Sequence, residues 1–316
     1  MLDGRTAAIM HTKFWHFLKI ALVLILALGL ALVATAHVNR TATVKAYFQA
    51  ERAWIRYWPV DTGRYSVERL VPVLCKAGIL APVRLEVEPH LSFLLNPLDV
   101  VPATILRAGE WQPEVWRSIE PSLPEGSVFL DVGAHIGYFS MKAAAKVGNT
   151  GRVLAFEPNP ETLKLLYDNV AANDARNVTV EPIACTDKAQ TLTFYAAAIE
   201  NTGMSSLARK NAQVDGASPK AFTVQGRPID DVVRELNLTR VDAIKIDVEG
   251  AEVLVLRGSV ETLKRFHPKL VIEEIPDELA SFQTSMSDLA TLLQEAGYNH
   301  TRRLLPRGDD WEWTAQ

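Results

Sequence analysis

Three acidic side chains stand where a nucleoside cofactor could be bound: Asp131, Glu157 and Asp187. Asp131 lies in the apolar run V-F-L-D-V, which leads into the glycine-punctuated turn G-A-H-I-G at 133–137. Glycines at a strand-to-helix turn let the backbone approach a ligand closely. Glu157 follows Gly137 by 20 residues, which is the spacing at which a doubly wound sheet places an acid on a ribose diol. We therefore expect a cofactor site at this turn.

Two nucleoside cofactors are compatible with such a turn, and the charge beside it separates them. A dinucleotide places its pyrophosphate against the glycines and needs positive potential there, which Asp131 opposes. The glycines are also spaced G-x-x-x-G rather than G-x-G-x-x-G. S-adenosyl-L-methionine carries an ammonium and a sulfonium against one carboxylate, so acids at strand ends attract it. It is the expected cofactor, and a nicotinamide cofactor of an NAD(P)-dependent oxidoreductase is the alternative.

A second charged motif is I-K-I-D-V-E-G-A-E at 244–252, in which Lys245, Asp247 and Glu249 share one side of a strand. A buried parallel sheet tolerates such charges only where the strand leaves the core, and ligands bind at that carboxyl end. We expect Asp247 to face the cofactor and Glu249 to start the next helix, where a carboxylate is favoured. The alternative is structural, with Lys245 and Asp247 as an ion pair and Glu249 as a cap. Glu273 follows the next apolar run and either borders the second substrate or is solvated.

Strand and helix patterns alternate from residue 127 onward. The expected strands are 127–132, 151–157, 178–183, 242–247 and 269–274, and the expected helices are 137–147, 160–173, 228–236, 250–265 and 285–296. This alternation predicts an α/β fold, with a parallel sheet covered by helices on both faces. Further expectations are a mobile insert over the site at Asn201–Pro219, between the β-rich runs Thr191–Ala196 and Ala221–Gln225, and a closing hairpin made of Tyr298–Leu304 and Trp311–Thr314.

The N-terminal segment 1–40 carries an apolar stretch of its own. Residues 17–38 are long enough to span a hydrocarbon core about 30 Å thick, and the uncharged part exceeds the ~7–15 residues usual in a signal peptide. We expect a single-pass transmembrane helix; a signal peptide cleaved at A-T-A (34–36) is the alternative. Residues 41–104 are expected to form a helical and β lead-in or lid, with an amphipathic helix within 40–70. The cytoplasm holds S-adenosyl-L-methionine, so the catalytic domain is expected on that side.

Composition excludes some partners. The net charge is −4 and the pI about 6.0, so no electrostatic footprint for nucleic acid is present. Cys75 and Cys185 lack the C-x-x-C spacing, and the seven histidines show no H-x-x-x-H pattern. The sequence therefore shows no dedicated metal set, although Asp247 with a neighbouring acid is a conceivable site for a divalent ion.

Several segments together resemble the FkbM family of S-adenosylmethionine-dependent methyltransferases, over roughly residues 105–305. They are F-L-D-V-G-A-H-I-G-Y-F-S (129–140), A-F-E-P-N-P (155–160) with Asn169, I-D-D (229–231), I-K-I-D-V-E-G-A-E (244–252) with L-R-G (256–258), and G-E-W-Q-P (109–113). The resemblance implies a Rossmann-like seven-strand class I methyltransferase sheet in 105–316, with six parallel strands and one antiparallel. It also implies methyl transfer to a hydroxyl, with sugars, glycans or lipid-linked molecules as acceptors. The family's usual Asn in the glycine turn is His135 here.

The residues and the resemblance together give a candidate site. The cofactor-binding candidates are Glu110, Asp131, Gly133, Ala134, His135, Gly137, Tyr138, Glu157, Pro158, Asn159, Asp187 and Asp247. Asp247 is the first candidate for the base that accepts the hydroxyl proton, and His135 is the second. Lys245, Glu249 and Glu273 are placed on the acceptor side. A catalytically silent, membrane-tethered binding module is the remaining alternative.

Overall fold

The computed structural model describes residues 39–57, 68–306 and 308–315, and the chain divides into two compact units between Val83 and Arg84. The described elements of the first unit are α2 (Arg40–Tyr57), η1 (Glu68–Leu70) and α4 (Val71–Lys76). Asn39 caps α2, because its Oδ1 accepts a hydrogen bond from the Ala42 amide at 3.0 Å. The amphipathic helix expected within 40–70 is therefore present over α2.

Within the described parts of the chain, no helix is long and apolar enough to cross a membrane. The anchor expected at 17–38 and the alternative cleavage site at 34–36 both lie outside the described residues.

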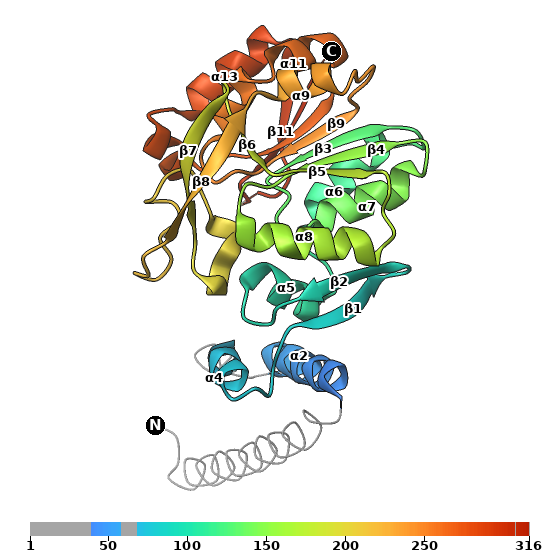
Figure 1. Cartoon of the computed structure of the whole chain (residues 1–316), viewed down its shortest axis with the longest axis vertical. Coiled ribbons are helices and arrows are strands. Elements are labelled where there is room, and N and C mark those ends of the chain that lie inside the picture. The colour runs from blue at the N-terminus through green and yellow to red at the C-terminus, as the bar shows by residue number, and fades with distance from the viewer. Residues whose placement is uncertain (1–38, 58–67, 307, 316) are drawn as a thin grey trace, which may run out of the picture. The chain divides into compact units, whose positions relative to one another are not determined.

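Among the described residues, seven strands form the main sheet of the second unit, in the order β11-β12-β10-β9-β3-β4-β5 (Figure 1). They are β3 (Val128–Val132), β4 (Arg152–Phe156), β5 (Val178–Glu181), β9 (Ala243–Ile246), β10 (Lys269–Glu273), β11 (Tyr298–Arg303) and β12 (Asp310–Ala315). Strand β12 is antiparallel to both of its neighbours, and the remaining pairs are parallel. Strand order changes direction between β3 and β9, which makes the carboxyl ends of these two strands the expected binding place.

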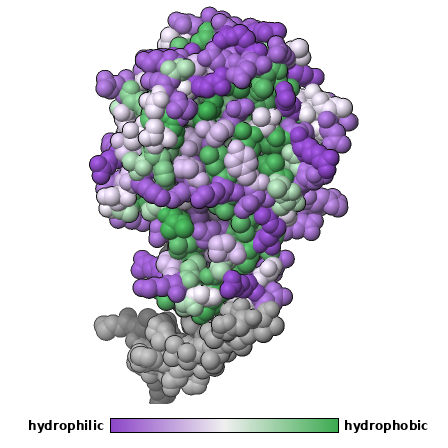
Figure 2. All heavy atoms as spheres, viewed as in Figure 1, coloured by the Kyte–Doolittle hydropathy of each residue, from purple (hydrophilic) through white to green (hydrophobic). Residues whose placement is uncertain are grey.

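Helices cover both faces of this sheet, as expected from the alternating pattern. Their bounds are α5 (Val100–Ala108), α6 (Pro113–Ile119), η2 (Glu120–Ser122), α7 (Tyr138–Val147), α8 (Pro160–Ala172), α9 (Ile229–Glu235), α10 (Glu252–Arg257), α11 (Val260–Phe266), α12 (Pro276–Leu279), η4 (Ala280–Phe282) and α13 (Met286–Glu295). Leu130, Leu154 and Ile244 point to the face covered by α9 to α13, where they form the larger core. Ala155 meets Leu166 of α8 on the opposite face. Hydrophilic residues predominate on the molecular surface seen in Figure 2, with apolar ones between them.

The helix expected over 250–265 is interrupted, and α10 and α11 are separate elements. The break falls at Gly258, where the backbone passes close to the chain after β6. A Cβ at Gly258 would lie 2.1 Å from the Thr186 carbonyl oxygen. This close approach depends on tertiary packing, which explains why the helical pattern did not reveal it.

The strand expected over 178–183 is also two elements, because the chain leaves the main sheet at Pro182. Proline has no N–H to donate to a strand ladder. Beyond it, β6 (Ile183–Cys185) pairs with β8 (Lys220–Arg227), which pairs with β7 (Gln190–Ala196) in a second sheet. The segment between β7 and β8 contains η3 (Ile199–Met204).

A hairpin of β1 (Val83–Glu88) and β2 (Leu91–Leu95) precedes α5. Asn169 on α8 holds β2, because its Oδ1 accepts the Leu94 amide at 2.8 Å. The same side chain donates from Nδ2 to the Ile136 carbonyl at 2.9 Å. Asn169 is fully buried and links the hairpin, α8 and the glycine turn. From Arg84 onward, the segment expected as a lead-in therefore belongs to the unit that contains the sheet.

Candidate active site

A cavity of about 350 Å³ lies at the carboxyl ends of the central strands. Its walls include 132–136 after β3, 156–158 after β4, 183–185 in β6, 201–205 in the η3 segment and 247–249 after β9. This is the edge of an open α/β sheet where ligands bind, and the volume is in the range of small-molecule pockets.

The glycine turn is shaped by two left-handed glycines. Gly133 has φ 80°, and a Cβ there would lie 1.8 Å from the Asp247 carbonyl oxygen. Gly137 has φ 83° and precedes the first residue of α7, and a Cβ there would lie 2.5 Å from Leu166 Cδ1. Only glycine fits either position, so the turn packs directly against the loop that carries Asp247.

Glu157 ties this turn to the start of α8. Its Oε2 accepts a hydrogen bond from the His135 amide at 2.8 Å, and its Oε1 accepts one from the Asn159 amide at 2.8 Å. Burial raises the pKa of Glu157, while His135 and the two amides oppose that rise. The Thr162 side chain also hydrogen-bonds to this carboxyl group. An ionised carboxylate offers about four acceptor positions, so acceptor capacity remains for a hydroxyl of a ligand in the cavity.

Lys245 and Asp247 form an ion pair, with Nζ 2.9 Å from Oδ2. This is the structural alternative that the sequence indicated for these two residues. Lys245 Nζ also lies 4.0 Å from Asp131 Oδ1 and donates to the Gly133 carbonyl at 3.4 Å. Burial alone would lower the pKa of Lys245, but Asp247 and Asp131 raise it above its ordinary value. The ammonium therefore remains charged. Asp247 nevertheless lines the cavity, and its Oδ1 is the oxygen left for a ligand.

His135 contacts two residues that sequence reasoning missed, Asp99 and Thr202. Its Nε2 is 2.6 Å from Thr202 Oγ1, and Thr202 Oγ1 donates to Asp99 Oδ2. Because the single hydroxyl hydrogen goes to Asp99, the pattern assigns the His135 proton to Nε2 and leaves Nδ1 as an acceptor in the neutral ring. Asp99 precedes α5 as an N-cap residue would, but nothing in the sequence connects it to residue 202, which lies 103 positions away.

Most of the candidates named from the sequence line the cavity. They are Gly133, Ala134, His135, Tyr138, Glu157, Pro158, Lys245, Asp247, Glu249 and Glu273.

Five other candidates do not line it. Asp131 is buried and accepts a hydrogen bond from a serine in the first turn of α7 at 2.5 Å. Gly137 and Asn159 are the N-cap residues of α7 and α8. Glu110 lies in the turn before α6. Asp187 lies between β6 and β7, because the chain has left the main sheet at Pro182 and no longer brings its acid to the strand ends.

Glu249 does not start a helix, contrary to the expectation. It is a loop residue with φ 56°, and α10 begins at Glu252. Glu252, the first residue of α10, instead holds the loop before the helix, because its Oε1 accepts the Val248 amide at 3.2 Å and the Gly250 amide at 3.1 Å. Glu249 is thereby left beside Asp247 at the cavity.

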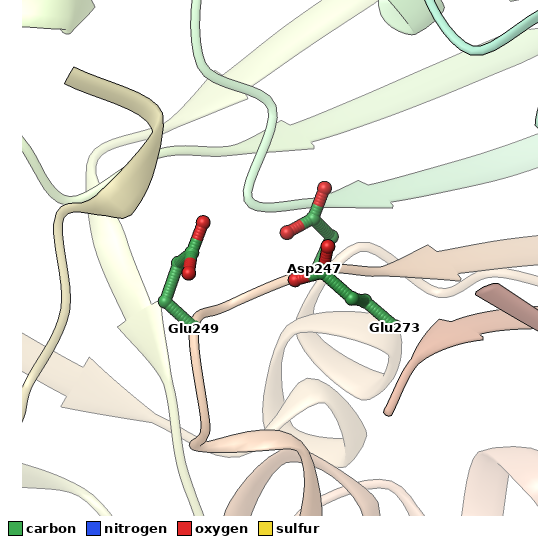
Figure 3. A group of neighbouring side chains, drawn as sticks. All are labelled: Asp247, Glu249 and Glu273. Carbon is green, nitrogen blue, oxygen red and sulfur yellow. The ribbon is translucent and has the colours of Figure 1, made fainter. Parts of the chain in front are cut away.

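Glu249, Asp247 and Glu273 point toward a common space, as Figure 3 shows. One oxygen from each carboxyl group can be chosen so that all lie within 4.8 Å of one another. Burial raises the pKa of Glu249 and of Glu273, and the neighbouring acids raise both further. This end of the cavity is strongly acidic.

A seven-strand sheet with one antiparallel strand, and a glycine turn after β3 beside a buried acid after β4, is the arrangement expected of a class I methyltransferase. The Methyltransferase FkbM domain matches residues 131–299, which is more than half of the chain. The protein belongs to the FkbM methyltransferase family. The group transferred is therefore a methyl group rather than the hydride of the oxidoreductase alternative.

Two curated proteins and one solved structure are similar to this chain. Methyltransferase 1 of Beauveria bassiana (strain ARSEF 2860) is 30% identical over 188 residues, covering 55% of this chain and 73% of that protein. Hexuronic acid methyltransferase AglP of Haloferax volcanii is 26% identical over 202 residues, covering 63% of this chain and 75% of that protein. Methyltransferase FkbM from Methylobacillus flagellatus KT has a crystal structure that matches at 20% identity and a TM-score of 0.41, covering 80% of this chain and 60% of that chain.

S-adenosyl-L-methionine is the methyl donor that this family assignment supports.

Proposed function

We propose that the protein is an S-adenosyl-L-methionine-dependent O-methyltransferase. One observation carries the proposal. The glycine turn contacts Glu157 through the His135 amide on one side and packs against the Asp247 backbone at Gly133 on the other. Glu157, after β4, would hold the ribose hydroxyls, and Asp247 follows β9 on the other side of β3. The two carboxylates therefore flank the region where a bound methyl donor would present its sulfonium.

The reaction that suits this geometry is an in-line displacement. The bond from the methyl carbon to sulfur breaks as the bond to the acceptor oxygen forms, and sulfur leaves as a neutral thioether. The protein contributes mainly by positioning the two substrates. The hydroxyl proton passes to Asp247 or to Nδ1 of His135, since both side chains line the cavity.

A sugar, glycan or lipid-linked hydroxyl is the proposed acceptor. The relative from Haloferax volcanii is named for methylation of a hexuronic acid, and an anchored enzyme would work beside lipid-linked glycans. The anchor at 17–38, with the catalytic domain on the cytoplasmic side, is part of this proposal.

Calorimetric titration of the full-length protein with S-adenosyl-L-methionine and, separately, with NAD tests the cofactor assignment. We expect saturable binding of the first and none of the second. Binding of NAD alone would overturn the proposal. Binding of S-adenosyl-L-methionine without turnover on any acceptor would favour the silent binding module instead.

A further inference from the structure

The three carboxylates at the acidic end of the cavity come from two neighbouring parallel strands. Asp247 and Glu249 follow β9, and Glu273 is the last residue of β10. The sequence separates Glu273 from the other two by more than 20 positions, but the parallel pairing brings all three together (Figure 3). Acids that are dispersed in this way form no recognisable spacing pattern in the sequence.

A second observation points to a ligand at this place. Oε2 of Glu273 is buried and has no hydrogen-bond partner among the residues that the structure describes. Oε1 of Gln112, another side chain lining the cavity, is likewise buried without a partner among those residues. Buried polar atoms are normally satisfied, and an exception calls for an explanation such as a bound ion or water. Both atoms are oxygens, which are the ligands that hard cations prefer.

The positive charge near the three carboxylates is less than their combined negative charge. Lys245 is the cation paired with the cluster, and it engages Oδ2 of Asp247. Two further acids adjoin the cluster: Glu278 lies within hydrogen-bond reach of Glu249, and Asp310 is opposite Glu273 on β12. Among the described residues, Lys245 is the one ammonium paired with these five acids, and it also lies beside Asp131. A divalent cation would relieve their mutual repulsion and would satisfy the orphaned oxygen of Glu273.

We propose that Asp247, Glu249 and Glu273 bind a divalent cation of the oxygen-preferring kind, Mg²⁺ or Mn²⁺. Mg²⁺ holds its ligands at about 2.1 Å, so two oxygens on one ion are about 3 to 4.2 Å apart. The separations of up to 4.8 Å seen here close to that range by small side-chain rotations.

The use of the ion rests on the proposed function, whereas its binding does not. An ion at this end of the cavity would hold two oxygens of the acceptor, such as a hydroxyl and a neighbouring hydroxyl or carboxylate. The hydroxyl would lose its proton more readily to one of the two proposed bases, Asp247 or His135, and its oxygen would then take the methyl group as the carbon–sulfur bond breaks.

Titration of the full-length protein with Mn²⁺, followed by the paramagnetic resonance signal of free Mn²⁺ in the absence of S-adenosyl-L-methionine, tests the site. We expect one saturable site per chain, with Mg²⁺ as a competitor. Glu273→Gln should weaken Mn²⁺ binding by at least about tenfold. Glu274→Gln is the matched control, because it removes the same charge one position along, from a side chain that instead accepts a hydrogen bond from Trp313 Nε1 at 2.7 Å.

No saturable Mn²⁺ binding at millimolar concentrations would overturn the proposal, as would equal weakening by Glu273→Gln and Glu274→Gln. Thermal melting of each variant checks the fold, and Asp247→Asn replaces Glu273→Gln if that variant does not fold. Mn²⁺ binding by a protein that fails to bind S-adenosyl-L-methionine would refute the proposed function alone. Methyl transfer by a protein that binds no Mn²⁺ would refute the cation site alone.

Discussion

At the scale of single residues, Glu157 shows how a cofactor site and a fold can depend on the same side chain. Its two oxygens fix the His135 and Asn159 amides, and the same residue lines the cavity. The spacing from the glycine turn predicted this residue in the cavity wall. The sequence could not predict its hydrogen bonds to the turn, because they depend on how two strand ends pack side by side.

Replacing Glu157 should lower affinity for the cofactor. A hydrogen bond to a charged group is worth about 1.5–3 kcal/mol, so Glu157→Ala should weaken S-adenosyl-L-methionine binding roughly tenfold or more. Calorimetry measures the change, and Glu161→Ala is a control on the exposed side of α8, where Glu161 pairs with Lys220. Unchanged affinity in a folded Glu157→Ala protein would show that the ribose is held elsewhere.

Asp247 should matter more for turnover than for cofactor binding. In Asp247→Asn the amide keeps the shape but cannot take a proton, and loss of a general base typically costs about 10²–10⁴ in rate. Rate and S-adenosyl-L-methionine affinity are measured on the same preparation. A rate near that of the wild type would reduce Asp247 to the partner of Lys245 and make His135→Ala the next variant.

At the scale of elements, local patterns predicted the alternation of strands and helices well, and their errors have identifiable causes. The strand at 178–183 breaks because Pro182 cannot donate to the ladder, and the helix at 250–265 breaks where Gly258 meets the Thr186 carbonyl. The break at Pro182 removes Asp187 from the strand ends. Separately, α10 begins only at Glu252, so Glu249 stays in a loop at the cavity. Asp99 and Thr202 were missed because their contact joins segments that are remote in the sequence.

The η3 segment should restrain the bound cofactor through Thr202, whose hydroxyl and amide both donate to Asp99. Thr202→Val keeps the shape but removes the hydroxyl, so release of S-adenosyl-L-methionine should become several-fold faster. Thr202→Ser keeps the hydroxyl and should behave like the wild type. Stopped-flow displacement measures both rates, and equal release from Thr202→Val and Thr202→Ser would contradict this role.

Glu252, at the start of α10, should make stability depend on pH. Burial raises its pKa from 4.5 to about 8, so the folded state retains a proton that the unfolded state has lost. The contribution of this proton to folding stability is fully present below about pH 4.5 and is lost as the pH rises through about 8. Each unit of difference between the folded and unfolded pKa corresponds to about 1.4 kcal/mol. Glu252→Gln does not titrate.

Melting temperatures of Glu252→Gln and of the wild type should therefore diverge as the pH rises from 5 to about 9, with the variant becoming the more stable of the two. Comparison of the two proteins isolates Glu252 from Glu274 and Asp310, whose pKa values burial also raises to about 7. Glu261→Gln, at an exposed position on α11, is the control. A constant difference across this pH range would contradict the buried, protonated carboxyl group.

At the scale of the whole molecule, the motifs predicted the family and the sheet because they lie in one continuous stretch. The division of the chain after Val83 was harder to predict. The hairpin that follows belongs to the sheet unit because Asn169 holds it there, and this contact has no signature in the sequence. The anchor expected at 17–38 should retain the full-length protein in the membrane fraction after a salt wash. Recovery of a soluble protein, or of a chain cut after Ala36, would contradict that expectation.

Transfer of a labelled methyl group tests the central claim most directly. Full-length protein is incubated with labelled S-adenosyl-L-methionine and a membrane extract, and the labelled product is isolated and its methyl linkage identified. The proposed function predicts a methyl ether on a sugar, glycan or lipid-linked acceptor, with Asp247→Asn slower by about 10²–10⁴. Label on nitrogen or carbon, or equal labelling by the wild type and Asp247→Asn, would contradict it.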